Sequence, residues 1–273
     1  IVFKTPSKIA TEFCGPDGNI TSTMSIQSHR SYCIKSEAAK VTYQPNTLTS
    51  YQFSIIDDQG NTLKNFEVSH TKLLHVIVAR KDLQHFLHLH PDFDIETGIF
   101  IIPEFEFPAA GEYRIFADFI PSGGMGLGVT TFEDVTVAGE YVAQPIGSEE
   151  KAKLFGDYRV TLSTNGALQS EQESQLTFQI KKYGQPVTLE EYLGAKGHSA
   201  ILKEETLDYI HTHPVDDGDS TMSGESVKFT VRFPEAGKYK IFTQFQDGNI
   251  ITANHVVTVA PGQEAEEIDR INH

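Results

Sequence analysis

Short stretches of alternating apolar and polar residues recur along the chain, with turn residues between them. Residues 51–55, 158–162 and 175–180 place an apolar side chain at every second position. A period of two predicts β-strands with one buried face, and the clusters of Pro, Gly, Asn and Asp between them predict turns. Helical periodicity is scarce, and residues 188–193, which begin with a capping threonine, form the best short helix. We therefore predict an all-β chain.

Two sequence elements occur twice in the same order, which indicates an internal duplication. The first is a histidine followed thirteen residues later by His-x-His-Pro, at residues 75–91 and 198–214. The second is Phe-Pro-x-x-Gly-x-Tyr-x-x-Phe, at residues 107–116 and 233–242. Each repeat spans about 100 to 120 residues with many short strands, as in sandwiches of the immunoglobulin type. The predicted fold is two tandem immunoglobulin-like β-sandwich domains related by internal duplication.

The repeats set the expected domain boundaries. We expect an N-terminal segment at residues 1–39, a first sandwich at 40–139, a linker at 140–153, a second sandwich at 154–262 and an acidic tail at 263–273.

The first repeated element predicts a β-hairpin, because apolar and β-branched residues flank a polar turn at residues 80–83. With that turn, His75 lies directly opposite His88, and their Cβ atoms are about 4.5–5.5 Å apart. His90 shares the face of His88, because alternate side chains of a strand point to the same side. The second repeat predicts the same arrangement. We call His75, His88 and His90 the first histidine triplet, and His198, His211 and His213 the second histidine triplet.

Three converging imidazoles can bind copper or zinc, because neutral imidazole is a good ligand for both metals. Aligning the last strands of the two repeats places Glu133 of the first against His255 of the second, which makes His255 a fourth candidate ligand. The alternative is that the histidines are structural and hydrogen-bond within the sandwiches. A duplication copies structural histidines as faithfully as ligands, so their recurrence alone does not separate the two hypotheses.

Composition narrows the range of partners. The 273 residues include 37 acidic and 22 basic side chains, a net charge of −15. Such a charge repels phosphate groups, so we expect neither nucleic acid nor an anionic membrane surface as a partner, whereas a cation is favoured. No apolar stretch reaches the 18 residues that suggest a membrane-spanning helix, and we expect no transmembrane segment.

The two cysteines bear on the cellular compartment. A bridge between Cys14 and Cys33 would close a loop of about 20 residues and stabilise the fold by on the order of 3 kcal/mol, and free thiols are the alternative. The chain begins at Ile1, which fits the removal of a signal peptide or an anchor. We expect a location outside the cytoplasm, which is periplasmic, secreted or surface-anchored.

The second repeat resembles a known family. Gly194-Ala-Lys-Gly-His198, Tyr209-Ile-His-Thr-His-Pro214 and the element that begins at Phe233 are similar to a largely uncharacterised family of bacterial exported β-sandwich proteins associated with heavy-metal, especially copper, handling. The first repeat departs from this pattern before His75, where residues 69–74 lack glycine. The resemblance implies the second histidine triplet as metal ligands and, through the repeat, the first.

Two classes of function follow from these observations. The first is an exported protein that sequesters copper or zinc, or delivers it to another exported protein, with a histidine site in each repeat. The second is an adhesion or scaffolding module whose histidines are structural. We do not expect an enzyme, because the sequence contains no nucleophile elbow, phosphate-binding glycine loop or His-Glu-x-x-His motif.

Overall fold

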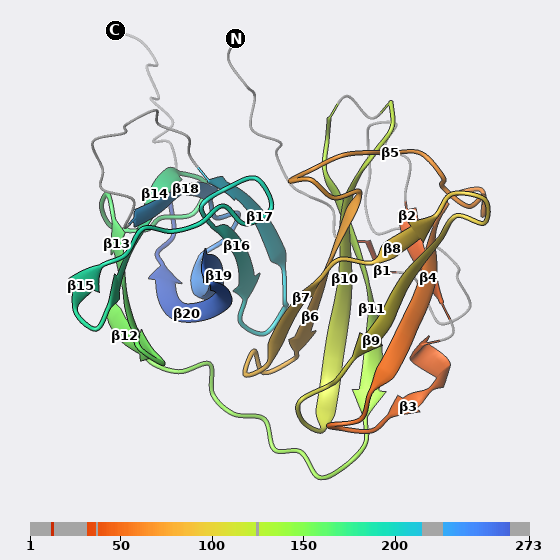
Figure 1. Ribbon diagram of the computed structural model, residues 1–273, viewed down its shortest axis with the longest axis horizontal. Helices are drawn as coiled ribbons and strands as arrows, with labels where there is room; N and C mark the ends of the chain where they lie inside the picture. The colour runs from red at the N-terminus through yellow and green to blue at the C-terminus, as the bar shows by residue number, and fades with distance from the viewer. Residues whose placement is uncertain (1–11, 14–31, 37, 124–125, 215–225, 263–273) are drawn as a thin grey trace, which may run out of the picture. The chain divides into compact units, whose positions relative to one another are not determined.

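The computed structural model describes residues 12–13, 32–36, 38–123, 126–214 and 226–262 of the chain (Figure 1). This part of the chain consists of β-strands and turns, and its one helical element is the 3-10 turn η1 (Ala38–Lys40). The all-β prediction is confirmed. Of the described residues, none belongs to a helix long and apolar enough to cross a lipid bilayer.

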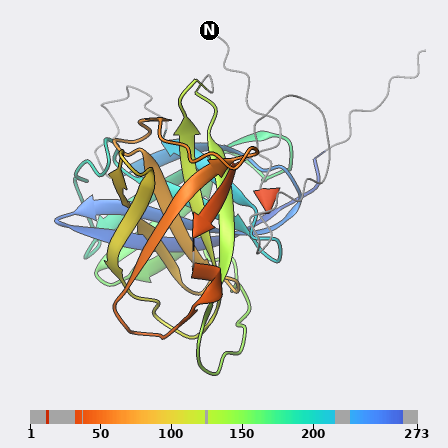
Figure 2. The same cartoon turned by 90° about the vertical axis from the view of Figure 1, so that its right-hand side faces the viewer.

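The first domain is a sandwich of two sheets, which lie one in front of the other in Figure 2. One sheet has the strand order β1-β11-β10-β6-β7, with β3 and β5 at its margins, and the other has the order β2-β4-β9-β8. Their bounds are β1 Glu12–Phe13, β2 Tyr32–Ser36, β3 Thr42–Tyr43, β4 Thr49–Asp57, β5 Phe66–Glu67, β6 Leu74–Arg80, β7 Phe86–Leu89, β8 Asp92–Asp94, β9 Ile99–Phe105, β10 Gly111–Pro121 and β11 Val129–Val137.

The second domain repeats this architecture. Its strands form one continuous sheet that folds over itself in the order β12-β13-β14-β18-β17-β16-β19-β20, and β15 pairs with β14. Their bounds are β12 Ala152–Phe155, β13 Tyr158–Thr164, β14 Glu173–Lys182, β15 Gln185–Pro186, β16 His198–Lys203, β17 Tyr209–Pro214, β18 Ser226–Arg232, β19 Gly237–Asp247 and β20 Asn249–Val259.

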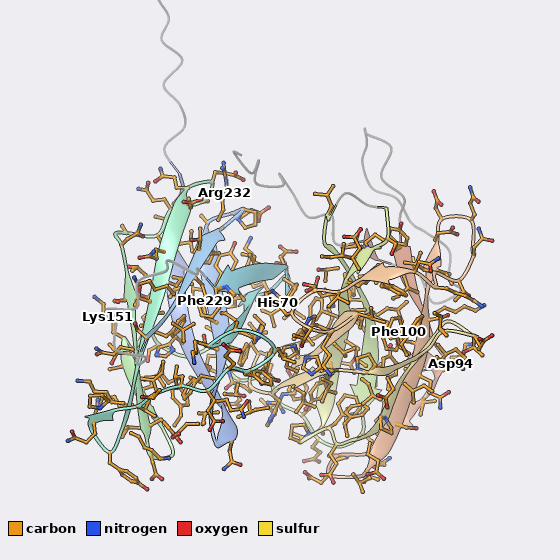
Figure 3. The ribbon with its side chains drawn as sticks, turned by 45° about the horizontal axis from the view of Figure 1, so that its top comes forward. His70, Asp94, Phe100, Lys151, Phe229 and Arg232 are labelled. Atoms are coloured by element: carbon orange, nitrogen blue, oxygen red, sulfur yellow. The ribbon has the colours of Figure 1, made fainter. Side chains whose placement is uncertain are left out.

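Each domain buries its own apolar core, the first between its two sheets and the second inside its single folded sheet. Phe100 lies in the core of the first domain and Phe229 in that of the second, and both are fully buried (Figure 3). Tyr113 and Tyr239 of the Phe-Pro-x-x-Gly-x-Tyr element donate hydrogen bonds to the carbonyls of Ala109 and Glu235, at 2.9 and 2.8 Å. The duplicated element is therefore a structural corner that anchors β10 and β19.

The His-x-His-Pro element carries the chain from one sheet to the other. In the first domain β7 pairs with β6 in one sheet, and β8 pairs with β9 in the other, so His90 and Pro91 lie at the crossing. Proline lacks the amide that would continue the strand ladder, which explains the break at this point. In the second domain β17 is unbroken and extends to Pro214.

The first sandwich begins earlier than the sequence pattern predicts. β2 precedes the expected start at residue 40 and pairs along its whole length with β4. Its residues Tyr32 and Ile34 belong to the first core. β2 was missed because one short strand within a segment rich in Ser, Thr and Gly gives little alternation. At the C-terminal end of the first domain, the chain passes from the first compact unit to the second between Ile146 and Gly147.

Cys33 is fully buried in β2 and is not a free thiol. Cys14 lies outside the described residues, so the bridge between the two cysteines stays a prediction.

Residues 188–193 do not form the predicted helix. Glu190 instead pairs with Gln246, and Tyr192 pairs with Ala195, as isolated strand bridges. The helix prediction is wrong because pairing with a distant strand outweighs a weak local helix propensity.

The turn of the β6–β7 hairpin lies one residue later in the chain than the predicted turn at residues 80–83. Val76 pairs with Leu89 and Ile77 pairs with His88, so His75 is not directly opposite His88 as predicted. The Arg80 amide donates to the His85 carbonyl at 3.0 Å, which leaves four residues in the turn. The strands are therefore displaced by two positions, and because side chains alternate with a period of two, the displacement leaves every side chain on its predicted face.

Candidate metal centre

The first histidine triplet lies on the face of the β6–β7 hairpin that points away from the core of the first domain. Leu74, Val76 and Val78 of β6 belong to that core, so His75 points to the opposite side. His75 is 4% exposed, and His88 and His90 are half-buried. The β-branched and apolar residues around the histidines thus favour the strand. Because side chains of a strand alternate between its two faces, the histidines face away from the core.

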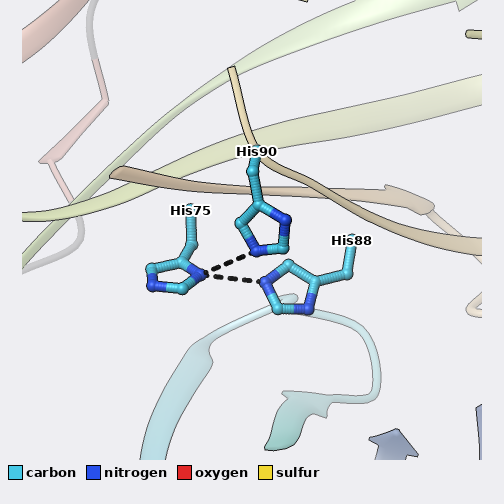
Figure 4. Close-up of side chains that lie close together, drawn as sticks. All are labelled: His75, His88 and His90. Carbon is cyan, nitrogen blue, oxygen red and sulfur yellow. Dashed lines mark hydrogen bonds between the residues drawn. The ribbon is translucent and has the colours of Figure 1, made fainter. Parts of the chain in front are cut away.

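The three imidazoles of the first triplet converge on one point (Figure 4). His75 Nδ1 lies 3.1 Å from His88 Nε2 and 3.2 Å from His90 Nε2. Each histidine offers one ring nitrogen, and these three atoms all lie within 4.8 Å of one another. The structure thus brings together His75, His88 and His90.

These distances suit tetrahedral coordination of a metal. With metal–nitrogen bonds of about 2.0–2.1 Å, two nitrogen ligands of a tetrahedral ion are about 3.3 Å apart. The observed separations of 3.1 and 3.2 Å differ from this value by one or two tenths of an ångström. An ion between the three nitrogens would require small ring rotations and would leave its fourth position for a further ligand or water.

A backbone hydrogen bond fixes the orientation of His75. Its Nε2 lies 3.1 Å from the carbonyl oxygen of Ser69, which can only accept, so Nε2 carries the proton. A neutral imidazole with a protonated Nε2 presents a lone pair at Nδ1, the atom that faces His88 and His90. Metal-binding histidines characteristically donate their second ring nitrogen to a carbonyl or carboxylate. A metal ion between the three rings would use the lone pair of His75 Nδ1 together with one lone pair from each of the other two rings.

Ser69 belongs to a tight turn that the sequence did not reveal. Ser69 and Lys72 exchange both backbone hydrogen bonds, at 2.8 and 3.0 Å. The two residues between them, His70 and Thr71, have φ values of 47° and 66°. Positive φ is unfavourable for β-branched threonine, and glycine adopts it freely.

The second repeat contains the same turn at the corresponding position. Tyr192 and Ala195 exchange backbone hydrogen bonds of 2.7 and 3.2 Å, around Leu193 and Gly194 with φ values of 53° and 77°. The departure of the first repeat from the glycine-containing sequence therefore leaves the backbone geometry unchanged. The sequence signal that could have revealed the turn in both repeats is its spacing, because each turn begins six residues before the first histidine of its triplet.

His198 of the second triplet is oriented in the same way as His75. Its Nε2 lies 2.7 Å from the carbonyl oxygen of Tyr192, and its side chain is 8% exposed. His211 and His213 lie in β17, where the backbone of His213 pairs with Thr230. The side chains of these two histidines lie outside the described part of the structure, so the convergence of the second triplet stays a prediction.

His255 is not a fourth ligand of the second triplet. It pairs with Ile241, a core residue, whereas His198 pairs with Gln244 on the opposite face of the same sheet. Its Nε2 donates to the Val160 carbonyl at 3.3 Å, and its side chain is fully buried. Burial lowers the pKa of His255 to about 4. His255 is therefore a neutral core histidine, and its assignment as a ligand is corrected.

Glu133, the counterpart of His255, also points inward. It pairs with the core residue Ile115 and accepts hydrogen bonds from the hydroxyls of Ser36, at 2.6 Å, and Tyr51. Burial raises the pKa of the Glu133 carboxyl. Glu133 and His255 therefore occupy equivalent positions, as the alignment predicts, because both place a polar side chain in the core. Each side chain lies on the face of its sheet opposite to the first histidine of the triplet in its domain.

The comparisons with known proteins concern family and fold. Residues 32–137 and 152–261 each match the model of a family described as a domain of unknown function, DUF8832. The sequence matches no curated protein.

Among solved structures, a DUF4426 family protein from Pseudomonas aeruginosa has 13% identity and a TM-score of 0.31, and the match covers 42% of this chain and 100% of that one. Salmonella alpha-2-macroglobulin reacted with methylamine has 12% identity and a TM-score of 0.26, over 85% of this chain and 15% of that one. Invasin, a bacterial integrin-binding protein, has 13% identity and a TM-score of 0.27, over 86% of this chain and 40% of that one.

Proposed function

We propose that in this chain, which belongs to the DUF8832 family, the first histidine triplet binds one copper or zinc ion. The proposal is based on the geometry of that triplet. The observation that carries the proposal is the approach of His88 Nε2 and His90 Nε2 to His75 Nδ1, at 3.1 and 3.2 Å. These separations match the spacing of nitrogen ligands around a tetrahedral ion. The bond from His75 Nε2 to the Ser69 carbonyl supports the proposal, because it holds the lone pair of Nδ1 toward the other two rings.

We extend the proposal to the second histidine triplet. Its support is the equivalent turn at residues 192–195 and the equivalent bond from His198 Nε2 to the Tyr192 carbonyl. The chain would then bind two ions, one in each domain, and sequester them or pass them to another exported protein. A candidate general base, Asp118, lies beside only the first triplet, and its counterpart in the second domain is the amide Gln244, so a shared role of the two sites fits binding better than turnover and the proposed role is not enzymatic.

The proposed compartment lies outside the cytoplasm. Its support is that the buried Cys33 is not a free thiol, because structural disulfides persist in oxidising compartments. Treatment of the purified chain with an alkylating reagent should add no mass under denaturing, non-reducing conditions and should label both cysteines after reduction. Labelling without reductant would contradict this part of the proposal.

Isothermal titration of the full chain with Zn²⁺ and Cu²⁺ tests the metal site. We expect the double substitution His88→Ala and His90→Ala to remove one equivalent of bound metal per chain, because it removes two of three ligands. His85→Ala is the matched control, since His85 directly follows the turn of the same hairpin and is not part of the triplet, and it should keep the full stoichiometry. If the wild-type chain binds neither metal, or if the double substitution changes nothing, the histidines of the first triplet are structural.

A further inference from the structure

Asp118 lies beside the first histidine triplet on the neighbouring strand. In the pairing of β10 with β6, Asp118 is the direct partner of His75, so the two side chains share a face with Cβ atoms about 4.5–5.5 Å apart. Asp118 is 5% exposed, and its carboxylate accepts a hydrogen bond from the Thr130 hydroxyl at 3.2 Å. Thr130 is in turn the direct partner of Asp118 on β11.

The second domain has the same arrangement with an amide in place of the carboxylate. Gln244 is the direct partner of His198, is 8% exposed and donates from Nε2 to the Thr252 hydroxyl at 3.1 Å. Thr252 is the partner of Gln244 on β20, just as Thr130 is the partner of Asp118. The two sites thus share histidine, polar partner and threonine, and they differ by one negative charge.

The nearest cation on the same face of β10 is paired with another carboxylate, that of Asp134. Arg114, two positions along that face, is held by Asp134 on β11, with contacts of 2.7 and 3.0 Å to its two carboxylate oxygens. Asp134 is the direct partner of Arg114. Asp134 also binds the ammonium of Lys81 at 2.9 Å, so this carboxylate is shared by two cations, whereas Asp118 is the carboxylate in direct register with His75.

We propose that Asp118 is a specificity-determining residue of the first site, which favours a divalent over a monovalent metal ion. This inference rests on the proposed function. Three neutral imidazoles bring no negative charge, so a bound ion keeps its full charge in a largely buried position, where an unpaired charge is costly. The attraction of the Asp118 carboxylate scales with the charge of the ion and is twice as large for Zn²⁺ as for a monovalent ion at the same distance. Asp118 acts from the neighbouring strand as a charge-compensating residue, and Gln244 gives the second site no such preference.

Titration of the full chain with Zn²⁺, and separately with Ag⁺ as a redox-stable monovalent ion, tests this inference. To isolate the first site, the titrations use a chain in which His211→Ala and His213→Ala remove the second triplet. We expect Asp118→Asn to weaken Zn²⁺ binding by about tenfold, within the range for residues that support metal ligands, and to weaken Ag⁺ binding by distinctly less. Asp118→Glu keeps the charge and should keep most of the preference for Zn²⁺.

Glu112→Gln is the matched control. Glu112 lies on the same strand and face, six residues or about 20 Å from Asp118, and accepts a hydrogen bond from Thr136, its direct partner on β11. The Glu112→Gln substitution removes the same charge and should change neither affinity by more than about twofold, since charges of partly exposed groups at that distance are screened. The melting temperatures of the metal-free variants report folding separately from binding.

Unchanged Zn²⁺ affinity in Asp118→Asn, or equal losses for Zn²⁺ and Ag⁺, would overturn the inference. So would an equal effect of Glu112→Gln. These outcomes are distinct from failure of the proposed function, in which the parent chain binds neither ion and His88→Ala has no effect.

Discussion

Two histidines of this chain lie on sandwich strands but face opposite sides of their sheets, so one is surrounded by imidazoles and the other by apolar rings. His75 points away from the core toward two other imidazoles, and His255 points into the core toward the rings of Phe155 and Phe178. The sequence predicted the first correctly because the hairpin fixes which positions share a face. It could not do so for His255, because an alignment shows that two positions correspond and does not show toward which side of the sheet they point.

The buried His255 predicts a dependence of stability on pH. Its pKa is about 4 in the folded chain and about 6.5 when exposed, so the unfolded chain binds the additional proton between these values. The stabilisation is fully present above pH 6.5 and is lost as the pH falls through 4, by at most about 3 kcal/mol. Urea unfolding of the wild-type chain and of His255→Leu at pH 7, 5.5 and 4 measures this. The wild-type value should fall more steeply than that of the variant, and parallel pH profiles would refute the prediction.

The elements that carry the first triplet are a four-residue hairpin turn and the two-residue turn at Ser69–Lys72. The sequence predicted the hairpin and the face of its histidines, and it predicted the pairing of the strands incorrectly by two positions. Local polarity locates a turn approximately but does not give its exact limits, which here depend on Asp82. Its carboxylate binds the guanidinium of Arg80 at 2.8 and 2.9 Å and accepts from the Gln84 amide at 3.1 Å. The two-residue turn escaped prediction because the β-branched residue Thr71 is not typical of positive φ.

Relief of the unfavourable backbone at Thr71 should stabilise the first domain. The substitution Thr71→Gly places glycine where the second repeat has Gly194, and we expect the free energy of unfolding to rise by about 0.5–1 kcal/mol, because the cost of positive φ exceeds the added entropy of the unfolded chain. Gly194→Thr is the reciprocal change and should lower it by a similar amount. Thermal unfolding of both variants measures this. Metal affinity should stay unchanged, since the Ser69 carbonyl keeps its position, and a destabilised Thr71→Gly would show that the turn is not strained.

At the scale of the whole molecule, the chain is two sandwiches with separate cores, which the sequence predicted from its repeats and its period of two. Each core is made only of residues from its own repeat. What the sequence could not predict is that the His-x-His-Pro element crosses between sheets, since the crossing depends on which distant strand pairs with each half. Because the cores are separate, an ion bound to one triplet should stabilise only the domain that holds it.

Calorimetry of the full chain tests this independence. At a Zn²⁺ concentration 100 times the dissociation constant, bound metal should stabilise a domain by about 2.7 kcal/mol and raise its unfolding transition. His88→Ala with His90→Ala should abolish the shift of one transition, and His211→Ala with His213→Ala that of the other. A single transition that responds equally to both pairs of substitutions would mean that the two domains unfold as one unit.

The four-residue turn between β6 and β7 has a consequence for how such a chain can diverge. A change of two residues in the length of that turn can slide β7 along β6 by two positions, which leaves His88 and His90 on their present side because side chains alternate with a period of two. A change of one residue would instead rotate His88 and His90 into the apolar interior. Lineages that retain the site should therefore gain or lose residues here in pairs, and odd lengths should accompany loss of the histidines.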